Sequence, residues 1–380
     1  MKMSKIPYIC GFCIACFLGF NLPVYAADSP DMVVVELQQT EKIAALPLIS
    51  RSVPAFASSD TAGNANDNNY RTSWHGVIPG WLAYDLSTVP EDQRSKIVVA
   101  WYSDSYDYDP TIKSRSAYGV LADYTIEGNV APGGGTAPDS GWVALTETTN
   151  NIYHSRQHVV DFSGYNWLRI NVSKVNNANG SSTSINVDVH NAQAGVEDDW
   201  IIYGDSITAG SAALNGVVGT IGQVVNTKNP NYFPIVENGG TGSILSADGA
   251  HKINGWLSTF PGKYVGLAFG TNDSWGNPGA TDAYYKNMEY MVKTILAAGK
   301  VPVISKIPWS TCADVANNVP GYNAKIDALY TAYPQIIKGP DFWAAFKNKS
   351  EYLGPDGVHP SSKGYALMRQ QWADVLLGIR

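Results

Sequence analysis

The sequence predicts two domains of different fold class: an antiparallel β-sandwich over residues 32–194, and an α/β domain with a parallel sheet over residues 198–380. The length of 380 residues is long for one domain and suits two. The first half alternates aromatic and β-branched runs with clusters of Gly, Asn, Asp and Ser, and it lacks long helical periodicity. In the second half, apolar runs end in polar turns, and residues 361–378 are amphipathic. Residues 191–197 are the expected linker.

Residues 1–26 are expected to be a secretory signal peptide. Lys2 and Lys5 precede an apolar run that extends to Ala26, and small residues occupy the −3 and −1 positions of a cut after Ala26. Proline and asparagine interrupt the run, which disfavours a permanent membrane span. A lipidation signal ending at Cys16 is an alternative, disfavoured because the apolar core before it is short. The protein is therefore expected to be secreted or periplasmic and free of the membrane after cleavage.

Removal of the signal peptide would change both the cysteine content and the charge. Three of the four cysteines lie within it, which leaves Cys312 alone and excludes an intramolecular disulfide. The net charge would change from −7 to −9, because Lys2 and Lys5 are lost. A negative chain argues against nucleic acid or an anionic membrane as the main partner. The sequence does not indicate an oligomeric state.

The first domain is predicted from a series of short strands separated by turn residues. This pattern is typical of an antiparallel sandwich. The expected strands are residues 32–36, 81–86, 96–101, 123–127, 142–145, 158–162, 167–172 and 184–189.

Several segments of this domain together resemble the galactose-binding-like (F5/8 type C, discoidin-like) β-sandwich: residues 60–74, 79–86, 123–129, 158–162 and 165–170. The resemblance implies a jelly-roll fold and a possible carbohydrate-binding module. Because a fold does not establish binding, a purely structural role stays open. Tyr106 and Tyr108, in an aromatic loop, are the candidate sugar contacts, although the loop could equally be a solvated hairpin. The Asx-rich residues 60–68 could hold a structural calcium ion, but a plain turn explains them as well.

The second domain begins with an apolar run, residues 200–203, that ends in Gly204-Asp205-Ser206. This pattern predicts a strand followed by a tight turn into a helix. Ligands of open α/β sheets bind at the carboxyl ends of the strands. Ser206 is therefore a candidate nucleophile, although Asp205 or Ser206 could simply cap the helix.

A loop near the end of the chain could supply the groups that activate this serine. A serine hydroxyl is a weak nucleophile until an imidazole takes its proton, and a carboxylate orients that imidazole. Asp356 and His359 lie three residues apart in a loop stiffened by Gly and Pro, before the amphipathic segment. They are the candidate acid and base. This chemistry requires no cofactor or metal.

Acyl transfer also needs hydrogen-bond donors for an oxyanion. The amide of Asn272 follows a predicted strand at residues 264–269, and the N–H of Ser206 is a second candidate. A third strand, residues 233–237, precedes a glycine-rich loop that contains Gly240 and Gly242. Gly242 is the preferred donor, and Gly240 is the alternative.

The ordered motifs Gly204-Asp205-Ser206, Asn238 to Gly242, Gly270-Thr271-Asn272-Asp273 and Asp356-x-x-His359 resemble the SGNH (GDSL-type) hydrolases. The resemblance covers residues 198–380 and implies a flavodoxin-like, three-layer α/β esterase domain. By the same resemblance, Ser206 is the nucleophile, His359 the base and Asp356 the orienting acid. Asn272 and Gly242 then join Ser206 as oxyanion donors. Ile207 stands where the family name expects leucine.

The expected substrate is an acylated carbohydrate or a small ester. Trp275 and Trp309 follow strands at the expected site and would favour small acyl groups such as acetate, although they could be ordinary packing residues. Export, an acidic surface and the sandwich together favour a carbohydrate O-acetylesterase. A broad short-chain carboxylesterase or lipase with a structural sandwich is the main alternative. A non-catalytic glycan-binding protein is the second.

Overall fold

The computed structural model describes residues 46–103, 119–176, 181–214 and 218–379. The predicted signal peptide, the predicted strand at residues 32–36, and the loop residues Tyr106 and Tyr108 lie outside this range. Among the described residues, no helix combines the length and apolar character needed to cross a membrane.

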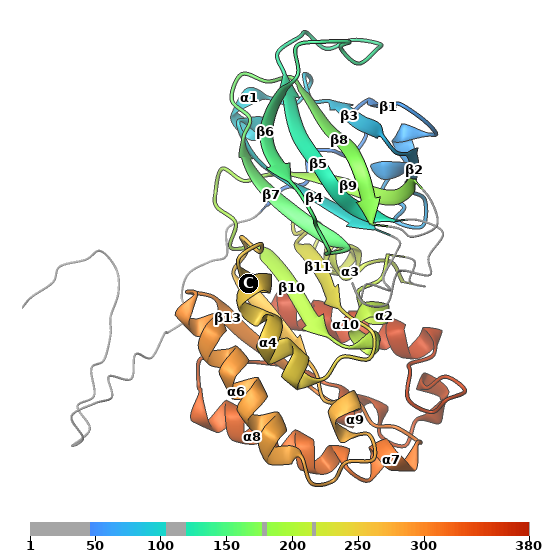
Figure 1. The fold of residues 1–380 in the computed structure, drawn as a ribbon, viewed down its shortest axis with the longest axis vertical. Coiled ribbons are helices and arrows are strands. Elements are labelled where there is room, and N and C mark those ends of the chain that lie inside the picture. Colours follow the sequence, from blue (N-terminus) through green and yellow to red (C-terminus); the bar gives the residue numbers. More distant parts are fainter. Residues whose placement is uncertain (1–45, 104–118, 177–180, 215–217, 380) are drawn as a thin grey trace, which may run out of the picture. The chain divides into compact units, whose positions relative to one another are not determined.

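The first half contains two antiparallel sheets (Figure 1). One has the strand order β1-β3-β8-β5-β6, and the other has the order β2-β9-β4-β7. The strands are β1 Ala55–Ala57, β2 Trp74–Val77, β3 Gly80–Asp85, β4 Lys96–Ser103, β5 Val120–Asn129, β6 Val143–Thr148, β7 Ser155–Asp161, β8 Trp167–Asn176 and β9 Ser182–Asn191. Two short helices accompany them, η1 Ala62–Ala65 and α1 Glu91–Arg94. Seven predicted strands coincide with β3 to β9, whereas β1 and β2 were not predicted.

Residues of both sheets contribute to one buried apolar cluster. It includes Trp74 of β2, Trp101 of β4, Ile126 of β5, Ile170 of β8 and Val187 of β9. In the predicted strands β3 to β9, apolar side chains of the runs that indicated the strands enter this cluster. The galactose-binding-like assignment of this arrangement stays a prediction.

The second half contains a parallel sheet with the strand order β11-β10-β12-β13-β14, so the predicted parallel α/β sheet is confirmed. The strands are β10 Asp199–Gly204, β11 Ile235–Gly240, β12 Tyr264–Ala268, β13 Val301–Lys306 and β14 Ile337–Asp341. The helices are α2 Ser206–Ser211, α3 Ile221–Lys228, α4 Ser246–Leu257, α5 Thr271–Ser274, α6 Thr281–Ala297, α7 Ala313–Ala316, α8 Val319–Ala332, α9 Phe342–Phe346, η2 Ser350–Tyr352 and α10 Ser362–Ile379.

Helices form two groups around this sheet (Figure 1). Helix α6 packs between α4 and α8, and α10 packs against α3 and α2. The strands between them are almost fully buried, as parallel strands are when both faces are covered. The amphipathic segment predicted at residues 361–378 corresponds to α10.

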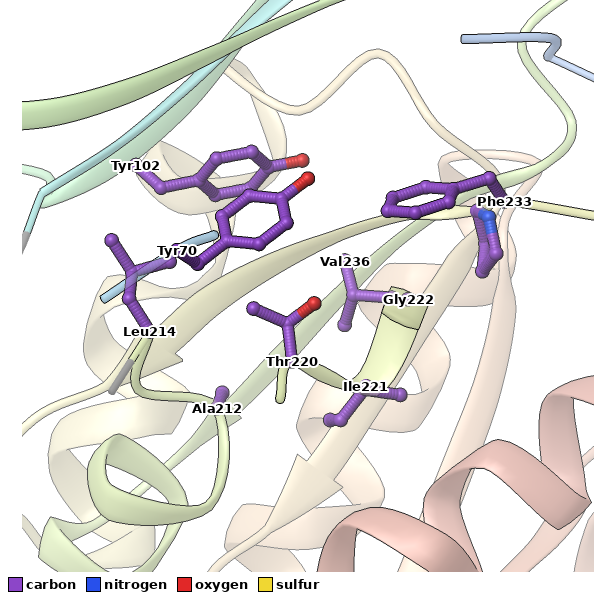
Figure 2. Close-up of a pocket in the computed structure, with 10 residues that line it drawn as sticks. Tyr70, Tyr102, Ala212, Leu214, Thr220, Ile221, Gly222, Phe233 and Val236 are labelled. Atoms are coloured by element: carbon purple, nitrogen blue, oxygen red, sulfur yellow. The ribbon is translucent and has the colours of Figure 1, made fainter. Parts of the chain in front are cut away.

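The two halves share a smaller buried cluster. Tyr70, Val98 and Tyr102 of the first half pack there with Leu214 and Ile235 of the second. A cavity of about 20 Å³ lies beside this cluster. Figure 2 shows residues that line it, among them the two tyrosines and Thr220 and Ile221 at the start of α3. Strand β11 is an edge strand, and this packing covers residues at its start.

Candidate active site

Ser206 lies where the connections of the parallel sheet change direction. Strand β10 pairs with β11 along one edge and with β12 along the other. The connection from β10 to β11 and the connection from β11 to β12 therefore run in opposite directions across the sheet. Such a switch point opens a crevice at the carboxyl ends of the strands. Gly204 is the last residue of β10, and the position requires glycine because a Cβ there would lie 2.5 Å from the Ala268 carbonyl oxygen. Asp205 caps α2 by accepting a hydrogen bond from the Ile207 N–H at 2.9 Å.

Three of the predicted site residues lie in one hydrogen-bonded series. The Ser206 Oγ lies 2.8 Å from His359 Nε2, and His359 Nδ1 lies 2.6 Å from Asp356 Oδ2. Ser206 and His359 are 153 residues apart in the chain, so only the fold brings them together. The carboxylate can hold the imidazole with Nε2 facing the serine.

The loop that carries Asp356 and His359 is closed by its own backbone. Asp356 Oδ1 accepts hydrogen bonds from the N–H groups of Val358 and His359, each at 3.0 Å. Gly354 donates its N–H to the His359 carbonyl at 2.7 Å. Gly357 has a φ of 71°, a conformation that glycine adopts without strain. These contacts hold the acid and the base in one geometry before any substrate binds.

The Asp356 carboxyl is held in its ionised form. Partial burial opposes ionisation, but the His359 side chain and the backbone N–H groups of Val358 and His359 outweigh it, so the pKa of Asp356 lies below its usual value. Its side chain is 49% exposed and that of His359 is 43% exposed. The acid and base therefore lie at an open surface.

Asp205 lies beside this series in a different environment. Its side chain is buried, and burial raises its pKa to about 6 despite the hydrogen bond from Ile207 N–H and the nearby His359. Its carboxylate is engaged with the helix N-terminus, which accounts for its position without a part in the chemistry.

Asn272 has an oriented amide. Its Nδ2 donates to the Ile244 carbonyl at 2.9 Å, which leaves one N–H of the same amide for another acceptor. The next residue, Asp273, accepts hydrogen bonds from the N–H and the hydroxyl of Ser246 at the start of α4. Asn272 and the loop before α4 are therefore tied together.

The two candidate glycines differ in what their backbones do. The Gly240 N–H already donates to Asn238 Oδ1 at 3.0 Å, and a Cβ on Gly240 would lie 2.1 Å from the Ala209 nitrogen. Gly240 therefore allows the loop to pack against α2. No described atom would lie within 4 Å of a Cβ on Gly242, which faces open space.

Two residues of the first half reach this loop, and sequence reasoning missed both. His154 Nε2 lies 3.0 Å from the Gly240 carbonyl. The Ser155 Oγ accepts a hydrogen bond from the Asn238 N–H at 3.0 Å. Both are buried, and both lie more than 80 residues from their partners, so no local pattern marks them. The first half thus supports the strand that ends at the site.

The predicted substrate contacts Trp275 and Trp309 are not part of the hydrogen-bonded series of Ser206, His359 and Asp356. Trp275 follows α5 and is 46% exposed. Trp309 is half-buried and packs against the core of the second half. The described residues contain no group of three His, Cys, Asp or Glu side chains that could hold a metal ion. In the Asx-rich segment, Asp67 accepts hydrogen bonds from the Asn69 N–H and the Thr72 hydroxyl.

Comparisons with known proteins identify the second half. Residues 202–367 match the GDSL-like lipase/acylhydrolase family, so this part of the chain is a GDSL-like lipase/acylhydrolase domain. Similar solved structures include a lipase/acylhydrolase from Enterococcus faecalis, at 19% identity over 47% of this chain and 95% of that chain, with a TM-score of 0.40. A carbohydrate esterase of family 3 from Talaromyces cellulolyticus has 20% identity over 48% and 97%, with a TM-score of 0.39. A psychrotrophic esterase from Pseudoalteromonas has 17% identity over 48% and 97%, with a TM-score of 0.40. No curated protein matches the chain.

Proposed function

We propose that this chain is an exported serine esterase that removes acetyl or other small acyl groups from carbohydrate. The GDSL-like domain at residues 202–367 supports ester hydrolysis as the reaction class. The observation that carries the proposal is the hydrogen-bonded series of Ser206, His359 and Asp356 at the switch point of the sheet.

The proposed reaction proceeds in two halves. The Ser206 Oγ attacks the acyl carbonyl carbon while His359 Nε2 takes the hydroxyl proton. His359 then gives this proton to the departing sugar oxygen, and the acyl group stays on Ser206. In the second half a water molecule loses a proton to His359 and attacks the acyl-enzyme. Release of the carboxylic acid restores the Ser206 hydroxyl, and Asp356 stabilises the imidazolium in both halves.

Three donors are proposed for the oxyanion of each tetrahedral intermediate: the backbone N–H groups of Ser206 and Gly242 and the Asn272 amide. The open surroundings of Gly242 support it over Gly240, whose N–H is occupied by Asn238. The Asn272 amide is pre-oriented by Ile244, so it loses little freedom when the charge develops.

The exposure of the site supports a polymeric substrate. The side chains of Asp356 and His359 are 49% and 43% exposed, so an ester carried on a long chain can reach Ser206 without entering a closed tunnel. The predicted export, the resemblance of the first half to sugar-binding sandwiches and the exposed Trp275 are compatible with the same substrate class.

Acetate release from acetylated xylan and from p-nitrophenyl acetate tests the proposal. The wild-type chain should release acetate from both substrates, and Ser206→Ala should release it from neither. Ser163→Ala, at an exposed serine of the first half, is the matched control and should keep wild-type rates. Activity on the small ester alone would replace the carbohydrate esterase by a general short-chain esterase. Inactivity on both would favour a binding protein.

A further inference from the structure

A second cavity, of about 290 Å³, lies beside β10, β11 and α4 and is closed on one side by residues 152–155 of the first half. Ser206, Asp356 and His359 do not line it. Its inner residues, including Tyr203 and Glu237, are buried. Its outer residues His251 and Gly255 are exposed on α4. The cavity is therefore open to solvent at α4 and deep at the sheet.

Glu237, a buried carboxylic acid, is one of the residues that line this cavity. The side chain is only 4% exposed, and among the described residues its Oε1 has no hydrogen-bond partner. A buried carboxyl with an unpaired oxygen costs free energy, and the Glu237 residue that carries it lines the cavity. Burial raises the pKa of Glu237 to about 8, against the lowering effects of the Gln157 amide and the Arg156 guanidinium. At neutral pH the carboxyl therefore keeps its proton and can both donate and accept a hydrogen bond.

Aromatic side chains line part of the cavity, together with Ile201 and, toward the outside, Lys252. Tyr203 and Trp256 stack with their ring centroids 4.4 Å apart and their planes 15° apart, which fixes both rings. Tyr153 of the first half also lines the cavity. The hydroxyls of Thr241 and Thr259 add hydrogen-bonding groups. The cavity thus combines rigid apolar surface with a few polar groups, as binding pockets for small molecules do.

We propose that this cavity is a subsite for one neutral pyranose ring. Such a ring presents apolar C–H faces to aromatic surface and hydroxyls to a protonated carboxyl, and it needs no counter-charge. The volume corresponds to about ten water molecules at roughly 30 Å³ each, which is enough for a single ring. Thr241 lines the cavity and directly precedes Gly242, so the cavity reaches the loop that carries this proposed oxyanion donor. The inference rests on the proposed function, because the ring is taken to belong to the acylated carbohydrate.

Calorimetric titration with unacetylated sugars tests the subsite without any turnover. Xylose, glucose, galactose and xylobiose are titrated into a solution of the mature chain. At least one probe should bind with a millimolar Kd. Glu237→Leu should weaken this binding roughly tenfold or more, whereas Glu237→Gln, which keeps a donor and an acceptor, should stay within about threefold.

Two glycines offer a matched pair of variants that keep the fold. Gly255 on α4 and Gly378 on α10 are both helical, and no described atom would lie within 4 Å of a Cβ at either position. Gly255→Phe places a ring at the mouth of the cavity and should weaken sugar binding roughly tenfold, as Glu237→Leu does. Gly378→Phe should leave the Kd unchanged.

The outcomes separate this inference from the proposed function. If no probe binds, or if Gly255→Phe and Glu237→Leu bind as tightly as the wild type, the subsite is refuted. In that case, measured acetate release from acetylated xylan would still support the proposed function. Sugar binding that is lost in both variants, in a chain that releases no acetate from xylan, would support the subsite and refute only the deacetylation of carbohydrate.

Discussion

Glu237→Gln is expected to change how the stability of this protein depends on pH. The carboxyl is 4% exposed in the folded chain, and its pKa is raised to about 8 from an ordinary value of 4.5, chiefly by burial. Glutamine has nearly the same shape and no ionisable proton. The variant therefore removes one titration and leaves the packing nearly intact.

The direction of the effect follows from the two protonation equilibria. Below about pH 4.5 the carboxyl is protonated in the folded and unfolded states alike, and the wild type has the full stability that the neutral group allows. As the pH rises toward 8, the unfolded chain loses the proton while the folded chain keeps it, so unfolding becomes more favourable. Above pH 8 both states are ionised and the effect levels off. Glutamine shows none of this loss.

The size of the effect can be worked from the shift. A difference of about 3.5 pKa units at 1.36 kcal/mol each corresponds to a loss on the order of 5 kcal/mol between the two limits. Glu237 is one cause of the raised pKa of the nearby buried Asp199, so the variant also lowers that pKa, and this acts in the same direction as the loss of the Glu237 titration. We therefore expect the free energy of unfolding of Glu237→Gln, relative to wild type, to increase by a few kcal/mol between about pH 5 and about pH 8.

Urea unfolding at several pH values measures this difference. Glu351→Gln, at an exposed glutamate of η2, is the control, and its curve should run parallel to that of the wild type. Parallel curves for Glu237→Gln and wild type would refute the reasoning. They would mean that the Glu237 carboxyl is ionised in the folded chain or that the cavity hydrates it fully.

Three further predictions concern the proposed chemistry. Asp356→Asn should lower kcat about a thousandfold with little change in KM, because the imidazole loses its orienting charge; an unchanged kcat in ester hydrolysis assays would exclude Asp356 from the mechanism. Asn272→Ala should lower kcat roughly a hundredfold or more with a nearly constant KM, and a change in KM alone would argue against an oxyanion role. Gly240→Ala should lower the free energy of unfolding by about 1–3 kcal/mol, because its Cβ meets the backbone of Ala209, whereas Gly242→Ala should not; calorimetry that ranks the two in reverse would contradict the geometry.

Much of the fold could be predicted because its signals are local. The apolar run that becomes β10 and the turn at Asp205 lie within a few residues of each other, and the helix cap needs only its own N-terminus. Strand β2 was missed because Trp74–Val77 has four residues and includes a glycine. Its strand identity depends on pairing with β9, more than 100 residues away.

The candidate site also has residues that local motifs predicted and features that depend on distant contacts. Ser206, Asn272, Asp356 and His359 each occupy a recognisable motif, and the structure places three of them in one hydrogen-bonded series. Assignment of their catalytic roles stays a prediction. The preference for Gly242 over Gly240 also stays a prediction, to which the structure adds that the Gly240 N–H is already donated to Asn238.

The sequence by itself indicated the candidate residues for the chemistry and most of the segments that become strands, because residue type and short-range periodicity are properties of neighbouring positions. Tertiary structure alone decided that His154 and Ser155 of the first half support the glycine loop of the second. It also decided that Glu237, an ordinary strand residue in the sequence, lies buried in a cavity with a raised pKa. Burial and hydrogen-bond partners depend on what the rest of the chain packs against a residue, and those contacts join positions far apart in the sequence.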